Sequence, residues 1–261
     1  MLRPTSNRPA KGESHADQYA TLALLICVLG GAPAWAQTAP KMNYLGQVID
    51  LTELIPPPPP RESEAWKQDL AEVLEMQQNR TDAQVRSAIA DNVLSIYRFE
   101  DVLGPKYKKQ NLPVTDAFFE KLHADQRAIL IAAKNALQRP RPVVAHPKEV
   151  LALGGNPRLP TGYPSGAVVM TTLTAIVLSK MVPEQRFELS ERNREFALNR
   201  VVIGQHFPRD IRAGEIAGTV IAYAMMEVPA FMRDLEPART ELRQVLGLPA
   251  EPVAAGPEKT R

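Results

Sequence analysis

The sequence predicts an all-α protein. Its helices are expected to form a bundle in one domain that spans residues 63 to 248. Three observations predict it. Apolar residues recur at intervals of three and four along most of that span, which is the spacing of one face of a helix. Serine or threonine precedes several of these stretches, and glycine or proline ends them. No clear run of alternating strand residues interrupts the pattern, so we expect helices packed on helices.

The first two helices are marked by their caps. Ser63 can cap a helix, and Thr81 with Gln84 forms a capping box for the next one. Their apolar faces are expected to carry Trp66, Leu70, Val73 and Leu74, and then Val85, Ile89, Val93 and Ile96. The dipeptide Gly104-Pro105 then breaks the chain.

A third helix is expected after Pro113, with Thr115 as its cap. Its apolar face carries Phe118, Leu122, Ile129 and Ala133. This helix must end near Gln138, because the segment Arg139-Pro140-Arg141-Pro142 cannot continue it. A loop rich in glycine and proline, residues 154 to 162, leads into a long apolar helix that begins at Pro164-Ser165-Gly166 and ends before Pro183.

The remaining helices are expected from near Glu184 and from near Asp210, and Pro229 is expected to kink or restart the last helix. The first two carry Phe187, Phe196 and Ile203, and then Ile211, Ala217, Gly218 and Ile221. The small side chains at 217 and 218 permit close helix packing. The last helix ends near Gly247, and the tail of residues 249 to 261 is predicted to be disordered.

The N-terminus is typical of a secretory leader. The apolar residues 20 to 31 follow Arg3, Arg8 and Lys11 and lead to Ala34-Trp35-Ala36. This pattern predicts a signal peptide over residues 1 to 36, and therefore a periplasmic or secreted protein. Residues 37 to 62 are expected to form an extended, proline-rich arm, because the run from 56 to 60 favours polyproline II.

Composition excludes several kinds of partner. The net charge is only +2, so neither a nucleic-acid groove nor a polybasic membrane surface is expected. No apolar stretch is long enough for stable membrane insertion. The single cysteine, Cys27, lies in the leader, so the mature chain is expected to lack disulfides and cysteine-bound zinc. No metal or other cofactor is expected, and the sequence leaves open whether the chain forms a homo-oligomer.

Three short segments carry residues that suit phosphate chemistry. They are Lys134 with Arg141-Pro142, then Tyr163-Pro164-Ser165-Gly166, then Arg200 with His206 and Asp210. Taken singly, each has an ordinary structural explanation, such as a helix start or a surface ion pair. Together, the three cations can grip phosphate oxygens, and the helix start offers backbone N–H groups to the same anion. His206 can attack phosphorus if Asp210 holds its other ring nitrogen.

The order of these segments resembles the type 2 phosphatidic acid phosphatase superfamily, which includes the vanadium haloperoxidases. Within it, the chain is most similar to the class A bacterial nonspecific acid phosphatases. The likeness includes Tyr44-Leu45, Asp50-Leu51 and the run Asn199-Arg200-Val201-Val202, and it extends from residue 44 to the last helix.

The resemblance implies a helical bundle and a metal-independent reaction on small phosphomonoesters. It implies that Lys134, Arg141 and Arg200 hold the phosphate and that Ser165 and Gly166 donate to the same oxygens. It also implies that the third-motif histidine, here His206, forms a phosphohistidine that water then hydrolyses, while the aspartate of that motif, here Asp210, orients the ring.

One position departs from the family. The second motif of the family continues after Ser-Gly with a histidine that protonates the leaving oxygen, and this chain has Ala167 there. Alanine cannot donate a proton, and loss of a general acid lowers the rate by about a hundred- to ten-thousandfold. We therefore expect reduced activity, or a bias to good leaving groups such as phenolates. His146 and Tyr163 are the candidates for a replacement donor.

Two other functions are compatible with the same residues. A binding protein that takes phosphate or a phospho-ligand would keep the cationic site after losing useful turnover. A vanadate-dependent haloperoxidase is less expected, because the chain is short for that group and those enzymes rely on the histidine that Ala167 replaces.

Overall fold

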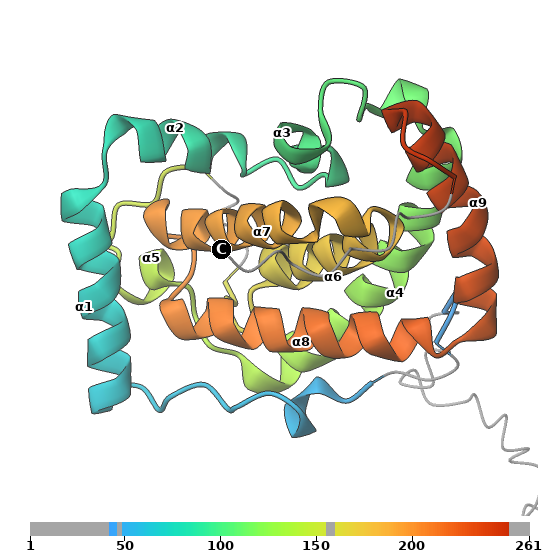
Figure 1. Cartoon of the computed structure of the whole chain (residues 1–261). Helices are drawn as coiled ribbons and strands as arrows, with labels where there is room; N and C mark the ends of the chain where they lie inside the picture. Colours follow the sequence, from blue (N-terminus) through green and yellow to red (C-terminus); the bar gives the residue numbers. More distant parts are fainter. Residues whose placement is uncertain (1–41, 46–48, 155–159, 251–261) are drawn as a thin grey trace, which may run out of the picture. The chain divides into compact units, whose positions relative to one another are not determined.

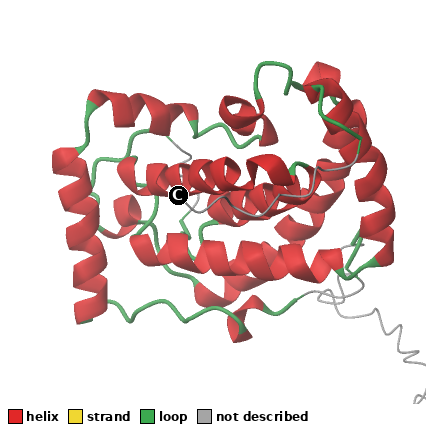
Figure 2. Cartoon of the chain, viewed as in Figure 1, coloured by secondary structure: helices red, strands yellow, loops and turns green. Residues whose placement is uncertain are grey.

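The computed structural model describes residues 42 to 45, 49 to 154 and 160 to 250. The predicted leader, and residues 251 to 261 of the predicted tail, lie outside the described residues. The described part contains helices and loops without a β-strand, apart from one isolated bridge between Pro140 and Thr161 (Figure 2). The all-α class is therefore confirmed.

The helices follow one another along the chain, and most of the connections between them are short (Figure 1). The α-helices are α1 (Glu64–Asn79), α2 (Asp82–Ala90), α3 (Glu100–Leu103), α4 (Pro113–Leu137), α5 (Pro142–Ala145), α6 (Gly166–Met181), α7 (Arg186–Val202), α8 (Pro208–Met226) and α9 (Pro229–Leu246). The 3-10 turns are η1 (Leu51–Glu53), η2 (Ile96–Phe99), η3 (Lys109–Asn111) and η4 (Pro183–Gln185).

The centre of the bundle is α6, which packs against α7 and α8 and touches α4 (Figure 1). A helix that is apolar on all sides belongs in the interior, and Val168, Leu173 and Val177 on α6 are completely buried. Two glycines on α8 permit the close approach of α6. A β-carbon at Gly218 would lie 2.8 Å from the backbone oxygen of Val169, closer than atoms can pack.

Most predicted helix boundaries agree with the structure. The Ser63 hydroxyl accepts from the backbone N–H of Trp66, and Thr81 and Gln84 form the reciprocal bonds of a capping box. Helix α4 ends at Leu137, where Gln138 takes a left-handed conformation with φ of 40°. Helix α9 begins at Pro229 and ends at Gly247, whose φ is 75°.

Three details of the predicted helices are wrong. Thr115 does not cap α4, which begins at Pro113; instead its N–H and hydroxyl both donate to Glu241 of α9. Helix α2 ends at Ala90, and Ile89 and Val93 are 50% and 65% exposed. The chain turns there because the buried carboxylate of Asp91 binds Arg192 of α7, with Nη1 to Oδ2 at 2.9 Å.

Phe187 is also misplaced by the sequence pattern, since it is 68% exposed whereas Phe196 and Ile203 are buried. The reason is helical geometry. Nine residues separate 187 from 196, which is two and a half turns at about 100° per residue, so the two side chains lie on opposite faces.

Membrane-spanning potential is limited in the part of the chain that the structure describes. No single helix there is long and apolar enough to cross a bilayer, and α8 and α9 meet the length and composition only as a pair bent by 96°.

Candidate active site

One cavity, of about 600 Å³, receives most of the predicted site residues. Lys134, Arg141, Gly166, Arg200 and His206 all line it, and they come from α4, from the loop after α4, and from α6, α7 and the loop before α8. Ser165 and Asp210 are fully buried and do not line it. The structure therefore brings together three segments that are far apart in the sequence.

The three cations converge on this cavity and influence one another. Burial, and then the charge of Arg141, lower the pKa of Lys134 to about 8. The pKa of Arg200 is lowered to about 10, mainly by burial. The charge of Asp91 opposes this shift, and the charge of Arg141 adds to it. Like charges held together in a partly dry site destabilise one another, and an anion would relieve that repulsion.

The cations are oriented by neutral oxygens. Lys134 Nζ donates to the carbonyl of Pro164 at 2.9 Å, and both terminal nitrogens of Arg200 lie 3.3 Å from Asn92 Oδ1. Neither contact neutralises the charge, so both groups stay cationic and can attract an anion.

The N-terminus of α6 meets the same cavity. Ser165 is its N-cap, and the buried Ser165 hydroxyl has no hydrogen-bond partner among the described residues. Gly166 is needed where α6 approaches α4, because a β-carbon there would lie 2.6 Å from Leu130 Cδ2. The free N–H groups of a helix start favour an anion at this place. Ala167 lines the cavity directly behind Gly166.

His206 is held at both ring nitrogens. Arg141 Nη1 lies 2.9 Å from Nε2, and Asp210 Oδ2 lies 3.4 Å from Nδ1. A guanidinium can only donate, so Nε2 carries the lone pair and the proton is on Nδ1, facing the carboxylate. Burial lowers the pKa of His206 to about 3, so the ring is neutral at ordinary pH. This tautomer presents its nucleophilic nitrogen to the cavity.

Asp210 is positioned by the start of α8. Pro208 is the first residue of that helix, and the Asp210 carboxylate reaches back to accept from the Phe207 N–H at 3.0 Å. The Asp210 carbonyl accepts from the Ser165 N–H at 2.9 Å, which ties the start of α8 to the start of α6. The local capping preference of aspartate in the first helical turn thus places the carboxylate beside His206.

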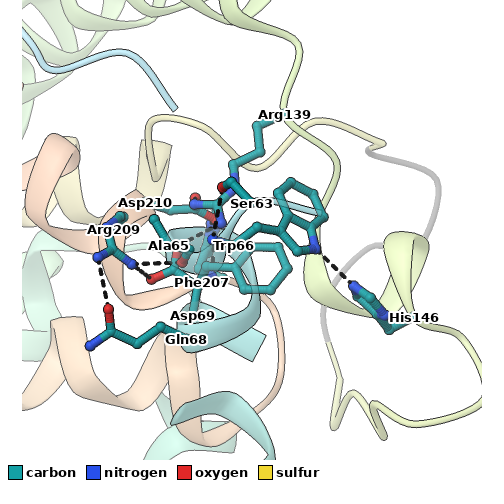
Figure 3. A network of polar contacts seen from close by, with 11 residues as sticks. Ser63, Ala65, Trp66, Gln68, Asp69, Arg139, His146, Phe207, Arg209 and Asp210 are labelled. Atoms are coloured by element: carbon teal, nitrogen blue, oxygen red, sulfur yellow. Dashed lines mark hydrogen bonds and ion pairs between the residues drawn. The ribbon is translucent and has the colours of Figure 1, made fainter. Parts of the chain in front are cut away.

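Neither candidate for a replacement proton donor lines the cavity. The hydroxyl of Tyr163 donates to the carbonyl of Pro56, in the proline-rich arm. His146 Nε2 accepts from Trp66 Nε1 at 3.1 Å (Figure 3). Its Nδ1 lies 3.2 Å from Glu149. The idea that one of them reaches the site is wrong in this structure, because each is engaged elsewhere by residues remote in sequence.

The structure adds several residues to those that the sequence predicts for the site. Arg139 was considered only as part of the segment that ends α4, yet its guanidinium contacts Asp210. Asn92 contacts Arg200, and His123 of α4 lines the cavity with its ring bound to Thr174. The one available signal was the spacing of Arg139 and Arg141, since alternate residues of an extended segment point the same way.

The described residues contain no group of three or more histidine, cysteine, aspartate or glutamate side chains that could hold a metal ion. Lys134, Arg141 and Arg200 are among the cationic side chains that line the described cavity.

Comparison with known proteins agrees with this architecture. Residues 126–233 match the model of the PAP2 superfamily. The chain is 30% identical over 218 residues to the non-specific acid phosphatase of Salmonella typhimurium, covering 79% of this chain and 86% of that protein. It is 29% identical to the non-specific acid phosphatase of Salmonella typhi, over 72% of this chain and 78% of that protein. A third relative, the non-specific acid phosphatase of Providencia stuartii, is 24% identical over 80% of this chain and 88% of its own length.

The described fold is an all-α bundle whose cavity is lined by cationic side chains and by a histidine paired with an aspartate. The chain belongs to the PAP2 superfamily, and the relatives it matches over most of their length are named non-specific acid phosphatases.

Proposed function

We propose that the protein is a metal-independent acid phosphatase that hydrolyses small phosphomonoesters through a phosphohistidine at His206. One observation carries the proposal. His206 lines one cavity with Lys134, Arg141 and Arg200. Its Nε2 contacts Arg141, and its Nδ1 lies against Asp210. A protein that only binds phosphate has no evident need for an oriented nucleophile. The names of the relatives support the same activity.

In this mechanism the phosphoryl group binds to the three cations and to the backbone N–H groups at the start of α6. Nε2 of His206 then attacks phosphorus, so that an N–P bond forms while the ester P–O bond breaks. Asp210 stabilises the positive charge that develops on the imidazole. Water next attacks phosphorus, the N–P bond breaks, and inorganic phosphate leaves with the ring restored. Charge on the phosphoryl oxygens is stabilised by the fixed cations throughout.

The leaving oxygen receives no proton from residue 167. Ala167 lines the cavity, and its methyl group has no acidic hydrogen. The departing alkoxide or phenolate must then take its proton from water. A phenolate is stable enough to leave in this way, whereas a sugar or alkyl alkoxide is not. We therefore propose an activity biased to good leaving groups and low on alkyl phosphates.

A phosphate or phospho-ligand binding protein is the second candidate, and Ala167 is the observation that favours it. The two functions differ in one measurable step. An enzyme transfers the phosphoryl group to His206, whereas a binding protein holds the intact ligand.

The decisive experiment is an acid-labile phosphoenzyme assay. The protein is mixed with a ³²P-labelled aryl phosphate, denatured at millisecond intervals, and examined for label bound through an acid-labile, alkali-stable bond. The proposal expects label in the wild-type chain and none in His206→Ala, which should also lose turnover. Turnover of the wild-type chain should be unaffected by a chelator. Tight binding of phosphate without label would establish the binding protein instead.

Location is part of the same proposal. The apolar run of residues 20 to 31, with Ala34-Trp35-Ala36 behind it, supports export and cleavage after residue 36. Cell fractionation with N-terminal sequencing of the mature protein would test it, and an N-terminus upstream of residue 20 would contradict it.

A further inference from the structure

We propose that Arg139 is a positioning residue, which holds Asp210 against His206 and is itself held by Asp69 of α1. This inference rests on the proposed function, because it concerns the nucleophile of that reaction. It adds Arg139, which lies within the first segment but was given no role there, and Asp69, which lies outside all three, to the residues on which turnover depends.

The first observation is that two arginines in one extended segment grip the two ends of the histidine–aspartate pair. Arg141 Nη1 contacts Nε2 of His206 at 2.9 Å, and Arg139 Nη1 contacts Oδ1 of Asp210 at 2.8 Å. Arg139 thus uses the carboxylate oxygen that His206 leaves free, since the ring faces Oδ2. A carboxylate held at both oxygens cannot rotate away from the ring.

The second observation is that Arg139 has no freedom of its own. It is 3% exposed, and its Nη2 binds Oδ2 of the fully buried Asp69 at 2.6 Å. Its guanidinium lies against two neighbouring aromatic rings, 4.9 Å from the centre of Trp66 and 4.1 Å from that of Phe207 (Figure 3). Cation–π contacts of this kind strengthen when water is excluded.

The third observation is that the network continues outward with alternating charge. Asp69 Oδ1 binds Arg209 Nη1 at 2.6 Å, and Arg209, with a side chain 39% exposed, also donates to the carbonyl of Ala65 (Figure 3). The order from surface to nucleophile is therefore Arg209, Asp69, Arg139, Asp210 and His206. Helix α1 supplies both Trp66 and Asp69, so it contributes to the site without touching the cavity.

This arrangement predicts an effect on the nucleophile and none on the anion pocket. Arg139 does not line the cavity, so the ground-state grip of Lys134, Arg141 and Arg200 on phosphate should survive its replacement. The alignment of His206 Nε2 for bond formation should be lost when Arg139 is replaced. Partners that orient a metal-binding histidine affect activity about 10- to 100-fold, and we expect a loss of the same order for a partner that orients this histidine through Asp210.

The test compares inorganic phosphate with vanadate, because vanadate bonds to the attacking nitrogen whereas phosphate is held by charge alone. The variants are Asp69→Asn, which never touches Asp210, and Arg139→Met and Arg139→Lys. We expect kcat on an aryl phosphate to fall, and the inhibition constant of vanadate to rise, by about 10- to 100-fold in Arg139→Met. KM and the inhibition constant of phosphate should stay within about twofold. Arg139→Lys should recover part of the loss, and Asp69→Asn should show the same pattern more weakly.

The matched control is Glu184→Gln, which weakens the ion pair of the buried Arg243 elsewhere in the bundle. It should lower thermal stability without changing the ratio of the vanadate and phosphate constants. If Arg139→Met does not fold, the same constants are compared for Asp69→Asn and Arg139→Lys. Equal loss of phosphate and vanadate affinity, or unchanged kcat in a folded Arg139 variant, would overturn the inference. Failure of the proposed function is distinguished by the wild-type chain, which would then show no turnover and no phosphoenzyme, or by His206→Ala, which would then keep the turnover.

Discussion

Nη1 of Arg141 lies 2.9 Å from Nε2 of His206, so one cation of the pocket contacts the atom that is proposed to attack phosphorus. The contact identifies the tautomer, because arginine can only donate. It also means that a bound phosphoryl group must take the place of this hydrogen bond, bringing its oxygens to the guanidinium as phosphorus comes to the ring. Binding and alignment are thus coupled through one pair of residues.

Restoring an imidazole at position 167 tests the missing acid. Ala167→His should raise kcat on an alkyl phosphate by about a hundredfold or more and on an aryl phosphate by much less, because only the poor leaving group needs the proton. Steady-state kinetics on the two esters measures the difference. Ala167→Gln serves as the control, since it has similar bulk and no acid of suitable pKa. An equal gain on both esters, or none on either, would count against the assignment.

The alkaline limb of the pH profile should belong to Lys134. Burial lowers its pKa to about 8, so the ammonium is charged below that pH and loses its charge as pH rises through it. The profile of kcat/KM reports groups of the free enzyme, and it should fall up to about tenfold per pH unit above pH 8. Lys134→Arg should move this limb upward, because arginine stays charged. A limb that does not move in that variant would show that another group controls it.

At the acid end, the pKa of about 3 for His206 keeps the ring neutral and nucleophilic above that pH. Any loss of kcat/KM between pH 4 and 6 should therefore follow protonation of the substrate, not of His206, and should shift with the pKa of the ester used. A limb in that range that is independent of the ester would contradict the assignment.

Tyr163 should not be the replacement acid. Its hydroxyl donates to Pro56, and burial raises its pKa to about 12. Tyr163→Phe should leave turnover of alkyl and aryl phosphates within about twofold and lower the free energy of unfolding by about 1 kcal/mol, the value of one hydrogen bond. Urea unfolding and parallel kinetics measure the two effects. Selective loss of alkyl ester hydrolysis would instead assign the proton transfer to this hydroxyl.

The contact of α6 with α8 should be intolerant of a single methyl group. In Gly218→Ala the new carbon would lie 2.8 Å from both the Val169 oxygen and Thr172 Cβ, so one helix must shift. We expect the free energy of unfolding to fall by about 1 to 3 kcal/mol, as for other overpacked cores. Tyr223→Ala, at an exposed position of the same helix, should change it by less than about 0.5 kcal/mol. Denaturant unfolding of both variants decides this, and equal stabilities would contradict the packing argument.

The helix starts were predictable because their signals are local. The hydroxyl of Ser63 and the Thr81–Gln84 pair act within one turn, and Pro229 restricts only its neighbours. The errors at Thr115 and at the end of α2 arose where a distant partner intervened. Helix α2 ends early because Asp91 binds Arg192 about a hundred residues later, and nothing near residue 90 announces that contact.

Much of the candidate site was predictable for a different reason. Lys134, Arg141, Gly166, Arg200 and His206 lie in three ordered segments whose chemistry is complementary, and the structure brings them to one cavity. Their individual roles stay predictions. Arg139 could not be assigned from sequence, since its partners Asp69 and Asp210 lie about 70 residues away on either side.

By itself, the sequence determined the all-α class and the order of the three segments that hold the candidate site residues. Only the tertiary structure decided which side chains line the cavity. Tyr163 and His146 do not line it, and Arg139 contacts Asp210. The physical reason is that helix caps and apolar spacing act over a few residues, whereas a side chain's direction depends on how helices remote in sequence pack together.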